Sequence, residues 1–300
     1  MSLIGDKEQL IQKSYDDLIE EMKNIQENVY KVIIQFLMKH QNQKPTKKQL
    51  LTINKLLAEH LSKTNFNDPV RKYLRSFDQV EELAKKIVGN EIGTDLSAMN
   101  ISVEKQMMVD EIVNGLLNED MINANLKQPL RKMLFRYTTT NITVQQIEQE
   151  LQSFILADRA KLGFAEKFVR EIASEALWQF DGMINQKIAT EYELDGFRFI
   201  GSLIVTSEPQ CVQMVNGTGE LGEMRINGKY SSKDLPKIIK KLKSNYKGVS
   251  KDLNESNYYT KRNHYGCRHS IIPTRLLERD KKAWEEKNDT VVTLLESQSN

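Results

Sequence analysis

Cysteine and histidine are scarce in this chain, and half of them are gathered in one short segment. The 300 residues include two cysteines and four histidines, and the segment RNHYGCRHSIIPT, residues 262–274, holds His264, Cys267 and His269. The other cysteine, Cys211, closes the segment TSEPQC at residues 206–211. Thiolate sulfur and imidazole nitrogen are the ligands that zinc prefers in tetrahedral sites. The four side chains are therefore a candidate zinc site, provided that folding brings the two segments together.

Strand pairing offers a way of bringing these segments together. If a strand over residues 197–205 pairs with one over residues 270–273, Cys211 would lie near the turn from His264 to His269. The spacing is not that of a standard zinc finger, so two other interpretations stay open. One is a disulfide between Cys211 and Cys267 formed after cell lysis, and the other is a turn held by hydrogen bonds from histidine and arginine.

Motifs typical of enzymes are absent from the sequence. A Cys–His nucleophile is disfavoured because no orienting Asn or Asp is evident. The chain has no P-loop, no G-x-G-x-x-G after a strand and no H-E-x-x-H. Glu175 is expected to support the neighbouring structure rather than to act as a catalytic acid. We therefore expect a protein that is not an enzyme.

Charge is distributed unevenly along the chain. The net charge is only +2, but residues 225–287 contain 17 Lys and Arg against 7 Asp and Glu. A basic region of this kind can face a polyanion such as double-stranded DNA without reading its sequence. The alternative is that these lysines form a solvated helix face. The candidate contacts are Lys237, Lys240, Lys241, Lys243, Lys247, Arg262 and Arg268.

The composition is that of a soluble globular protein. Hydrophobic residues make up 39% and charged residues 28% of the chain, and the longest apolar run is far shorter than a membrane span. The N-terminal residues carry acids where an export signal needs an apolar core. Two cysteines are too few for a disulfide framework. We expect a protein of the reducing cytoplasm that does not interact with membranes.

The N-terminal half has helical periodicity. A heptad stripe would pack on the chain's own helices or on a partner helix; it consists of Ile11, Tyr15, Leu18, Met22, Ile25, Val29, Val32 and Phe36. Thr46 with Gln49, and Thr143 with Gln146, are capping-box pairs that start helices. Pro69 and Pro129 are expected near helix starts, and Gly163 is expected to divide the helical run that follows Thr143.

The period changes after Gly196. GFRFIGSLIVT alternates like a strand, Asn227-Gly228 indicates a tight turn, residues 234–246 form a basic helix, and residues 267–275 contain a short strand. Trp178, Phe180, Phe197 and Phe199 are expected in the core. The predicted fold is α+β and predominantly α, with a helical N-terminal part followed by a small α+β C-terminal module. The predicted domains are a helical assembly region 1–142, an α+β module 143–275, and a helix with a polar tail 276–300.

Residues 164–274 resemble the phage Mu F-like minor head proteins, the phage head morphogenesis family. That pattern has a Thr-Glu pair in a long helix, a Gly-aromatic strand, a T-S-x-x-C turn, a hairpin and then H-P-x-C-R-C with a strand ending near Pro. Here Ser174-Glu175, GFRFIGSLIVTSEPQC, MVNGTGELGE and NHYGCRHSIIPT take these positions. The chain departs from the pattern at Ala173, where Arg is common, at Tyr265, where Pro is usual, and at His269, which replaces the last Cys.

The resemblance implies a structural minor capsid protein of a tailed bacteriophage. Such a protein would lie inside the head near the portal, assemble in the host cytoplasm, contact the portal protein and other head proteins, and touch packaged or ejected double-stranded DNA non-specifically. The helical N-terminal part would dock on the portal, with the heptad stripe as a seam for a partner helix. The alternative function is a zinc-stabilised, non-specific nucleic-acid-binding protein.

Overall fold

The computed structural model describes residues 2–40, 45–61, 63–140, 142–156, 162–264 and 266–297. The chain divides into two compact units, which we call the helical unit and the mixed unit. The helical unit contains residues 11–77 and 105–176, and the mixed unit contains residues 1–10, 78–104 and 177–300. The three domains predicted from the sequence have other boundaries, and they stay a prediction.

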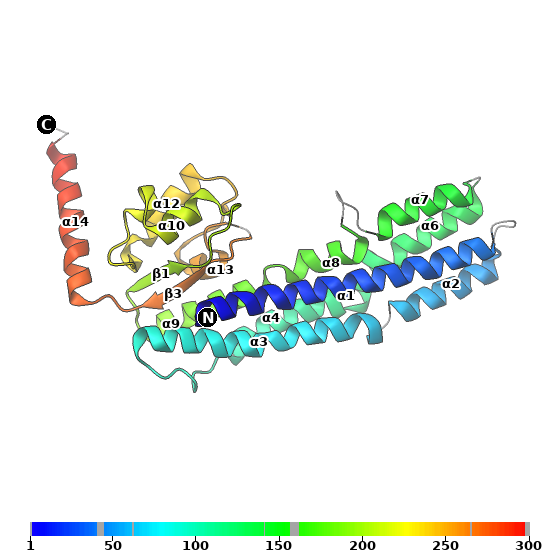
Figure 1. Ribbon diagram of the computed structural model, residues 1–300, viewed down its shortest axis with the longest axis horizontal. Coiled ribbons are helices and arrows are strands. Elements are labelled where there is room, and N and C mark those ends of the chain that lie inside the picture. The colour runs from blue at the N-terminus through cyan, green and yellow to red at the C-terminus, as the bar shows by residue number, and fades with distance from the viewer. Residues whose placement is uncertain are drawn as a thin grey trace. The chain divides into compact units, whose positions relative to one another are not determined.

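The helical unit is built from helices that bury one stripe each. Helices α1, α3 and α4 also extend into the mixed unit. The elements, in chain order (Figure 1), are α1 (Leu3–Lys39), α2 (Lys47–His60), α3 (Lys63–Ile92), α4 (Ser102–Ile112), the π-helical turn η1 (Val113–Leu117), α5 (Glu119–Ile122), the π-helical turn η2 (Asn123–Lys127), α6 (Gln128–Thr139), α7 (Val144–Ile155) and α8 (Phe164–Ala173).

The heptad stripe of α1 is buried inside the chain's own fold. Met22 and Val29 are fully buried, and the buried stripe then passes to Ile33 and Leu37 in place of the predicted Val32 and Phe36. A straight helix with 3.6 residues per turn drifts away from a seven-residue repeat, which explains the shift. The intramolecular alternative is therefore correct, and the stripe is not a seam for a partner helix.

Several helix ends lie where local sequence patterns predicted them. Both capping boxes are present, with the Thr46 and Thr143 side chains accepting from the third amide of α2 and α7. Gly163 precedes α8, and Pro129 lies in the first turn of α6. Pro69 was predicted at a helix start, but it lies inside α3. The helix begins earlier because Phe66 is fully buried and stacks on Phe168, with ring centroids 6.3 Å apart.

The mixed unit combines a small sheet with short helices. Its elements (Figure 1) are α9 (Ala176–Glu191), β1 (Gly196–Ile200), α10 (Pro209–Asn216), α11 (Gly219–Gly222), β2 (Tyr230–Ser231), the 3-10 turn η3 (Ser232–Asp234), α12 (Leu235–Asn245), the 3-10 turn η4 (Glu255–Asn257), α13 (Tyr258–Lys261), β3 (Ser270–Thr274) and α14 (Glu278–Ser297). The fold is thus α+β and predominantly α, as the sequence predicts. Among the described residues, no helix is both long and apolar enough to cross a bilayer.

The sheet has the order β2-β1-β3, and both pairings are antiparallel. The predicted strand over residues 197–205 is too long, because β1 ends at Ile200, opposite Ser270. Beyond it, Gly201 adopts φ +155, and Val205 is fully exposed. The ladder can continue only as far as its partner strand, so the alternating apolar residues that follow Ile200 have no strand to pair with.

The segment after β1 differs from the predicted hairpin. MVNGTGELGE forms the end of α10, a left-handed cap at Gly217 and the short helix α11. The tight turn is found later, where Asn227 and Gly228 both have positive φ and Ile226 bridges Lys229. Trp178, Phe180, Phe197 and Phe199 are all at most 4% exposed, so the predicted core residues are confirmed.

Candidate metal centre

Two elements position the cysteines. Cys211 lies in the first turn of α10, which begins at Pro209, while Cys267 lies between α13 and β3. A turn in which the Cys267 amide donates to the His264 carbonyl at 3.2 Å places His264 beside it. Because β1 leads into α10 and pairs antiparallel with β3, the two segments meet at one end of the sheet. The predicted approach of Cys211 to the His264–His269 turn is confirmed.

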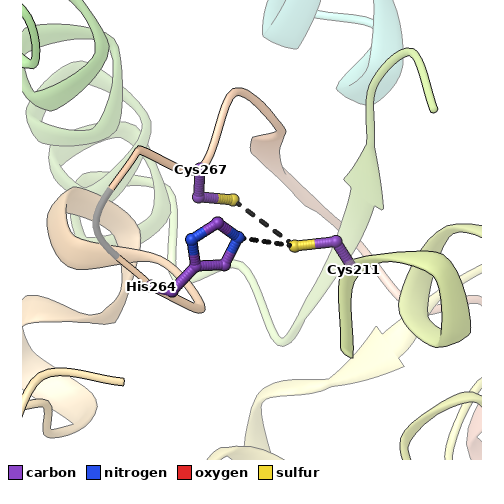
Figure 2. Close-up of side chains that lie close together, drawn as sticks. All are labelled: Cys211, His264 and Cys267. Atoms are coloured by element: carbon purple, nitrogen blue, oxygen red, sulfur yellow. Dashed lines mark hydrogen bonds between the residues drawn. The ribbon is translucent and has the colours of Figure 1, made fainter. Parts of the chain in front are cut away.

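Three of the four predicted ligands form one cluster, shown in Figure 2. The Cys211 Sγ atom is 3.3 Å from His264 Nε2 and 3.8 Å from Cys267 Sγ. The three ligand atoms all lie within 4.8 Å of one another. Both cysteines are free thiols and are at most 1% exposed, whereas His264 is half-buried. This group could hold a metal ion.

The spacing of the ligand atoms fits a tetrahedral ion. With zinc–sulfur and zinc–nitrogen bonds of about 2.3 and 2.0–2.1 Å, two sulfurs of one tetrahedron lie about 3.8 Å apart, and sulfur and nitrogen lie about 3.5 Å apart. The sulfur–sulfur distance of 3.8 Å between Cys211 and Cys267 has this value. The distance of 3.3 Å from the Cys211 sulfur to the His264 nitrogen is slightly shorter. Two of the three separations thus match a tetrahedral zinc ion, and the third, between His264 Nε2 and the Cys267 sulfur, is within 4.8 Å.

The two thiols differ in acidity. The hydrogen bond with Cys267 and burial together raise the pKa of Cys211. Burial alone would raise the pKa of Cys267, but hydrogen bonds from Cys211 and His269 and the charge of Arg262 hold the pKa of Cys267 well below its ordinary value. Cys267 is therefore the more acidic thiol of the pair. A thiolate is the form that binds a metal.

A buried polar layer surrounds the cluster. Asn263 is fully buried, and its Nδ2 lies 3.8 Å from the Cys211 sulfur and 3.3 Å from the Met214 sulfur. The Tyr258 hydroxyl donates to Asn263 Oδ1 at 3.0 Å. These contacts fix the chain immediately before His264. Asn263 was not among the residues predicted for the site, although it is the direct neighbour of a predicted ligand.

The prediction that Arg262 contacts DNA is wrong. The Arg262 side chain is 2% exposed, and its guanidinium lies 5.7 Å from the centre of the Trp178 ring. Its backbone has φ +55, a conformation that L residues seldom adopt. A buried guanidinium cannot reach a phosphate, so Arg262 supplies positive charge to the thiol pair instead.

The fourth predicted ligand, His269, lies next to the cluster but is not part of it. Its Nδ1 is 3.6 Å from the Cys267 sulfur, its ring stacks on Phe199, and its side chain is 5% exposed. It does not belong to the group of three whose ligand atoms all lie within 4.8 Å. The structure therefore places His269 in contact with one ligand.

Of the other predicted DNA contacts, all but Arg268 lie on or just after α12. Lys237, Lys240 and Lys243 are exposed on α12, whereas Lys247 follows the end of that helix. Lys241 pairs with Glu220 at 3.0 Å, and Lys237 lies 3.7 Å from Asp234. Arg268 is exposed. Acidic neighbours thus offset part of the positive charge that the sequence suggested.

In comparisons with protein-family models, with curated proteins and with solved structures, nothing matched this chain. The resemblance to the Mu F-like minor head proteins accordingly rests on the quoted motifs alone. Ser174-Glu175, which take the place of the Thr-Glu pair, lie in a turn between α8 and α9.

Proposed function

We propose that this chain is a structural, non-enzymatic protein of the head of a tailed bacteriophage, and that zinc fastens its C-terminal module. One observation carries the proposal. The two segments that resemble the Mu F-like pattern are 53 residues apart at Cys211 and His264, and they converge on one Cys-His-Cys cluster. A shared site gives a physical reason for both motifs to exist in one chain.

Zinc is the ion that suits this group best. Two thiolates and an imidazole at tetrahedral spacing are typical of structural zinc sites. The burial of both sulfurs leaves a substrate little access to them, which supports a structural role rather than a catalytic one. The ion would join α10 to the turn before β3, and thus cross-link segments that are far apart in the sequence.

Metal analysis of the purified full-length protein tests the zinc part. We expect about one zinc per chain, and we expect Cys211→Ser and Cys267→Ser to lose it, since each removes a ligand. Arg268→Ala is the matched control, because Arg268 is exposed in the same turn and belongs to no ligand set. Wild-type protein without zinc, even after refolding with Zn²⁺, would contradict this part of the proposal.

The partner that we propose is the portal protein, together with other head proteins. The buried heptad stripe is not the docking surface, so docking requires side chains on the outside of the helical unit. Leu51 on α2 and Phe135 on α6 are each 62% exposed. Large apolar side chains of this kind commonly mark protein interfaces.

Co-expression with the portal protein of the same phage tests the docking. We expect the chain to co-purify with the portal and to be present in purified particles by mass spectrometry, located inside the head. We expect Phe135→Glu to weaken co-purification, whereas Lys240→Glu on the mixed unit leaves it unchanged. A chain that is absent from particles and unbound in the presence of the portal would refute the structural role.

The second candidate is a zinc-stabilised protein that binds double-stranded DNA without sequence preference. The exposed lysines of α12 favour it. Contacts made by lysine with phosphates release counterions, so the affinity should fall steeply with salt. We expect Lys240→Gln with Lys243→Gln to reduce both the affinity and the salt slope. Affinity that hardly changes between low and high salt would exclude this mode of binding.

A further inference from the structure

His269 has a buried nitrogen without a hydrogen-bond partner. The Nδ1 side of its ring faces the Cys267 sulfur at 3.6 Å. Among the described residues, nothing forms a hydrogen bond with its Nε2, although the side chain is only 5% exposed. Buried polar atoms in folded proteins are nearly always paired, so this nitrogen needs an explanation.

Glu8, in the second turn of α1, has a matching buried oxygen. Its Oε2 accepts from the Ser202 hydroxyl at 2.8 Å, but its Oε1 is buried and has no partner among the residues that the structure describes. Both Glu8 and His269 belong to the mixed unit. A carboxylate oxygen accepts hydrogen bonds only, whereas an imidazole nitrogen can donate one.

Gly201 lies against both groups. A Cβ atom at this position would be 2.7 Å from His269 Cδ2, the carbon bonded to Nε2, and 3.1 Å from Glu8 Oε1. The unpartnered edge of the imidazole and the unpartnered oxygen of the carboxylate therefore face the same side of Gly201. Only glycine leaves room for both, and its φ of +155 is itself typical of glycine.

A metal bound to the other ring nitrogen accounts for this arrangement. A histidine that binds a metal through Nδ1 carries its remaining proton on Nε2, and this N–H usually donates a hydrogen bond to a carboxylate or a carbonyl. The 3.6 Å from Nδ1 to the Cys267 sulfur is close to the distance of about 3.5 Å between sulfur and nitrogen ligands of one zinc ion. Binding of Nδ1 to the same ion requires the ring to move toward the group of three, to which it does not belong in this structure.

We propose that His269 completes the metal centre through Nδ1, and that Glu8 is the positioning residue whose carboxylate accepts a hydrogen bond from its Nε2–H. This inference rests on the proposed zinc site. It adds a fourth ligand and a residue from the opposite end of the chain. The hydrogen bond from His269 to Glu8 would then connect the first turns of α1 to the metal. We expect this hydrogen bond to stabilise the fold more strongly when His269 is a metal ligand.

The test measures metal binding by the full-length protein with Zn²⁺ and Co²⁺ as probes. Competition with a chromophoric chelator gives the zinc affinity, and the absorption bands of bound Co²⁺ report the ligand set. Loss of a carboxylate that orients a ligating histidine typically weakens metal binding by about 10–100-fold. We expect this loss for Glu8→Ala, together with a changed cobalt spectrum. Glu8→Gln should recover part of the affinity, since its amide oxygen can still accept.

Two controls separate this effect from a general loss of structure. Ser202→Ala removes only the partner of Glu8 Oε2, and Glu20→Gln changes an exposed acid of the same helix. Both should keep the affinity and the cobalt spectrum of the wild type. If Glu8→Ala fails to fold by circular dichroism, Glu8→Gln and His269→Gln carry the test in its place.

The outcomes are distinguishable. Wild-type affinity and spectra in Glu8→Ala, or a wild-type cobalt spectrum in His269→Gln, would overturn this inference while leaving the three-residue zinc site intact. A wild-type protein that binds neither ion would overturn the zinc site and this inference together, and it would leave the proposed role in the phage head to be judged by its own test.

Discussion

At the scale of single residues, the site includes side chains whose role could not be predicted from the sequence. Cysteine and histidine are conspicuous because they are rare, and that was enough to select the three clustered ligands. Arg262 is only two residues before His264, yet its side chain is buried and its guanidinium lies over the Trp178 ring. Glu8 is one acid among 41 acidic residues and lies far away in the sequence, so no local pattern could have selected it.

Gly201 gives a prediction at this scale. Gly201→Ala would place a methyl group 2.7 Å from the His269 ring in a backbone conformation that alanine resists. We expect the free energy of unfolding to fall by about 1–3 kcal/mol, measured by urea denaturation. Gly248→Ala is the control, because Gly248 also has positive φ but has no atom within 4 Å of the added carbon. Equal losses in the two variants would show that crowding against His269 does not matter.

The buried ion pair of Lys7 and Asp181 gives a second prediction at the scale of single residues. The two side chains are 0% and 2% exposed and 2.6 Å apart, and the Ser270 hydroxyl also donates to Asp181. Lys7→Met leaves an unpaired buried carboxylate, which typically costs about 3–5 kcal/mol of unfolding free energy. We expect Lys7→Met with Asp181→Asn to recover most of this loss in thermal and urea unfolding. A double variant as unstable as Lys7→Met would mean that packing, and not charge, sets the cost.

At the scale of helices and strands, the sequence predicted an element's end correctly where that end is determined by neighbouring residues. Each T-x-x-Q pair forms its capping box within four residues, so the starts of α2 and α7 could be predicted. The length of β1 could not, because it is set by β3, some 70 residues later. The same holds for the start of α3, where the distant Phe168 stabilises the turn around Phe66.

The packing of α14 on the rest of the mixed unit should depend on pH. Asp195 accepts from the Leu276 amide at 2.7 Å, and Asp280 accepts from Asn227 at 2.7 Å. Burial alone would raise the pKa of both carboxyls, but these hydrogen bonds and nearby lysines hold each pKa below its ordinary value. A lowered pKa stabilises the folded state above the unfolded value of about 3.9, and this contribution is lost as the pH falls further.

We therefore expect α14 to lose hydrogen-exchange protection below about pH 4, before the sheet does. Asp280→Asn should weaken the attachment at neutral pH and flatten its dependence on pH. Glu278→Gln is the control, because the Glu278 side chain is 91% exposed. Loss of protection in α14 and in β1 at the same pH would contradict separate detachment of the helix.

At the scale of the whole molecule, the sequence predicted the fold class correctly, whereas the three predicted domains stay a prediction. Composition and periodicity distinguish helices from strands, and they gave an α+β fold that is mainly α. The compact units, however, are assembled from separated segments, because α1, α3 and α4 each continue from one unit into the other. Such a division depends on which residues meet in space, and a linear pattern does not contain that information.

Removal of the proposed zinc ion should affect the two units differently. Every residue of the Cys-His-Cys cluster lies in the mixed unit, so zinc can stabilise that unit directly, by about 4 kcal/mol when free zinc is a thousand times the dissociation constant. With a chelator in excess, we expect amides of β1 and β3 to exchange faster, while those of α7 in the helical unit keep their protection. Cys267→Ser without chelator should reproduce this pattern, and Arg268→Ala should not. Equal losses of protection in β3 and α7 would mean that the metal stabilises the whole chain as one cooperative unit. If protection changes in neither element, the cluster is held without metal, by the hydrogen bonds that join its three side chains.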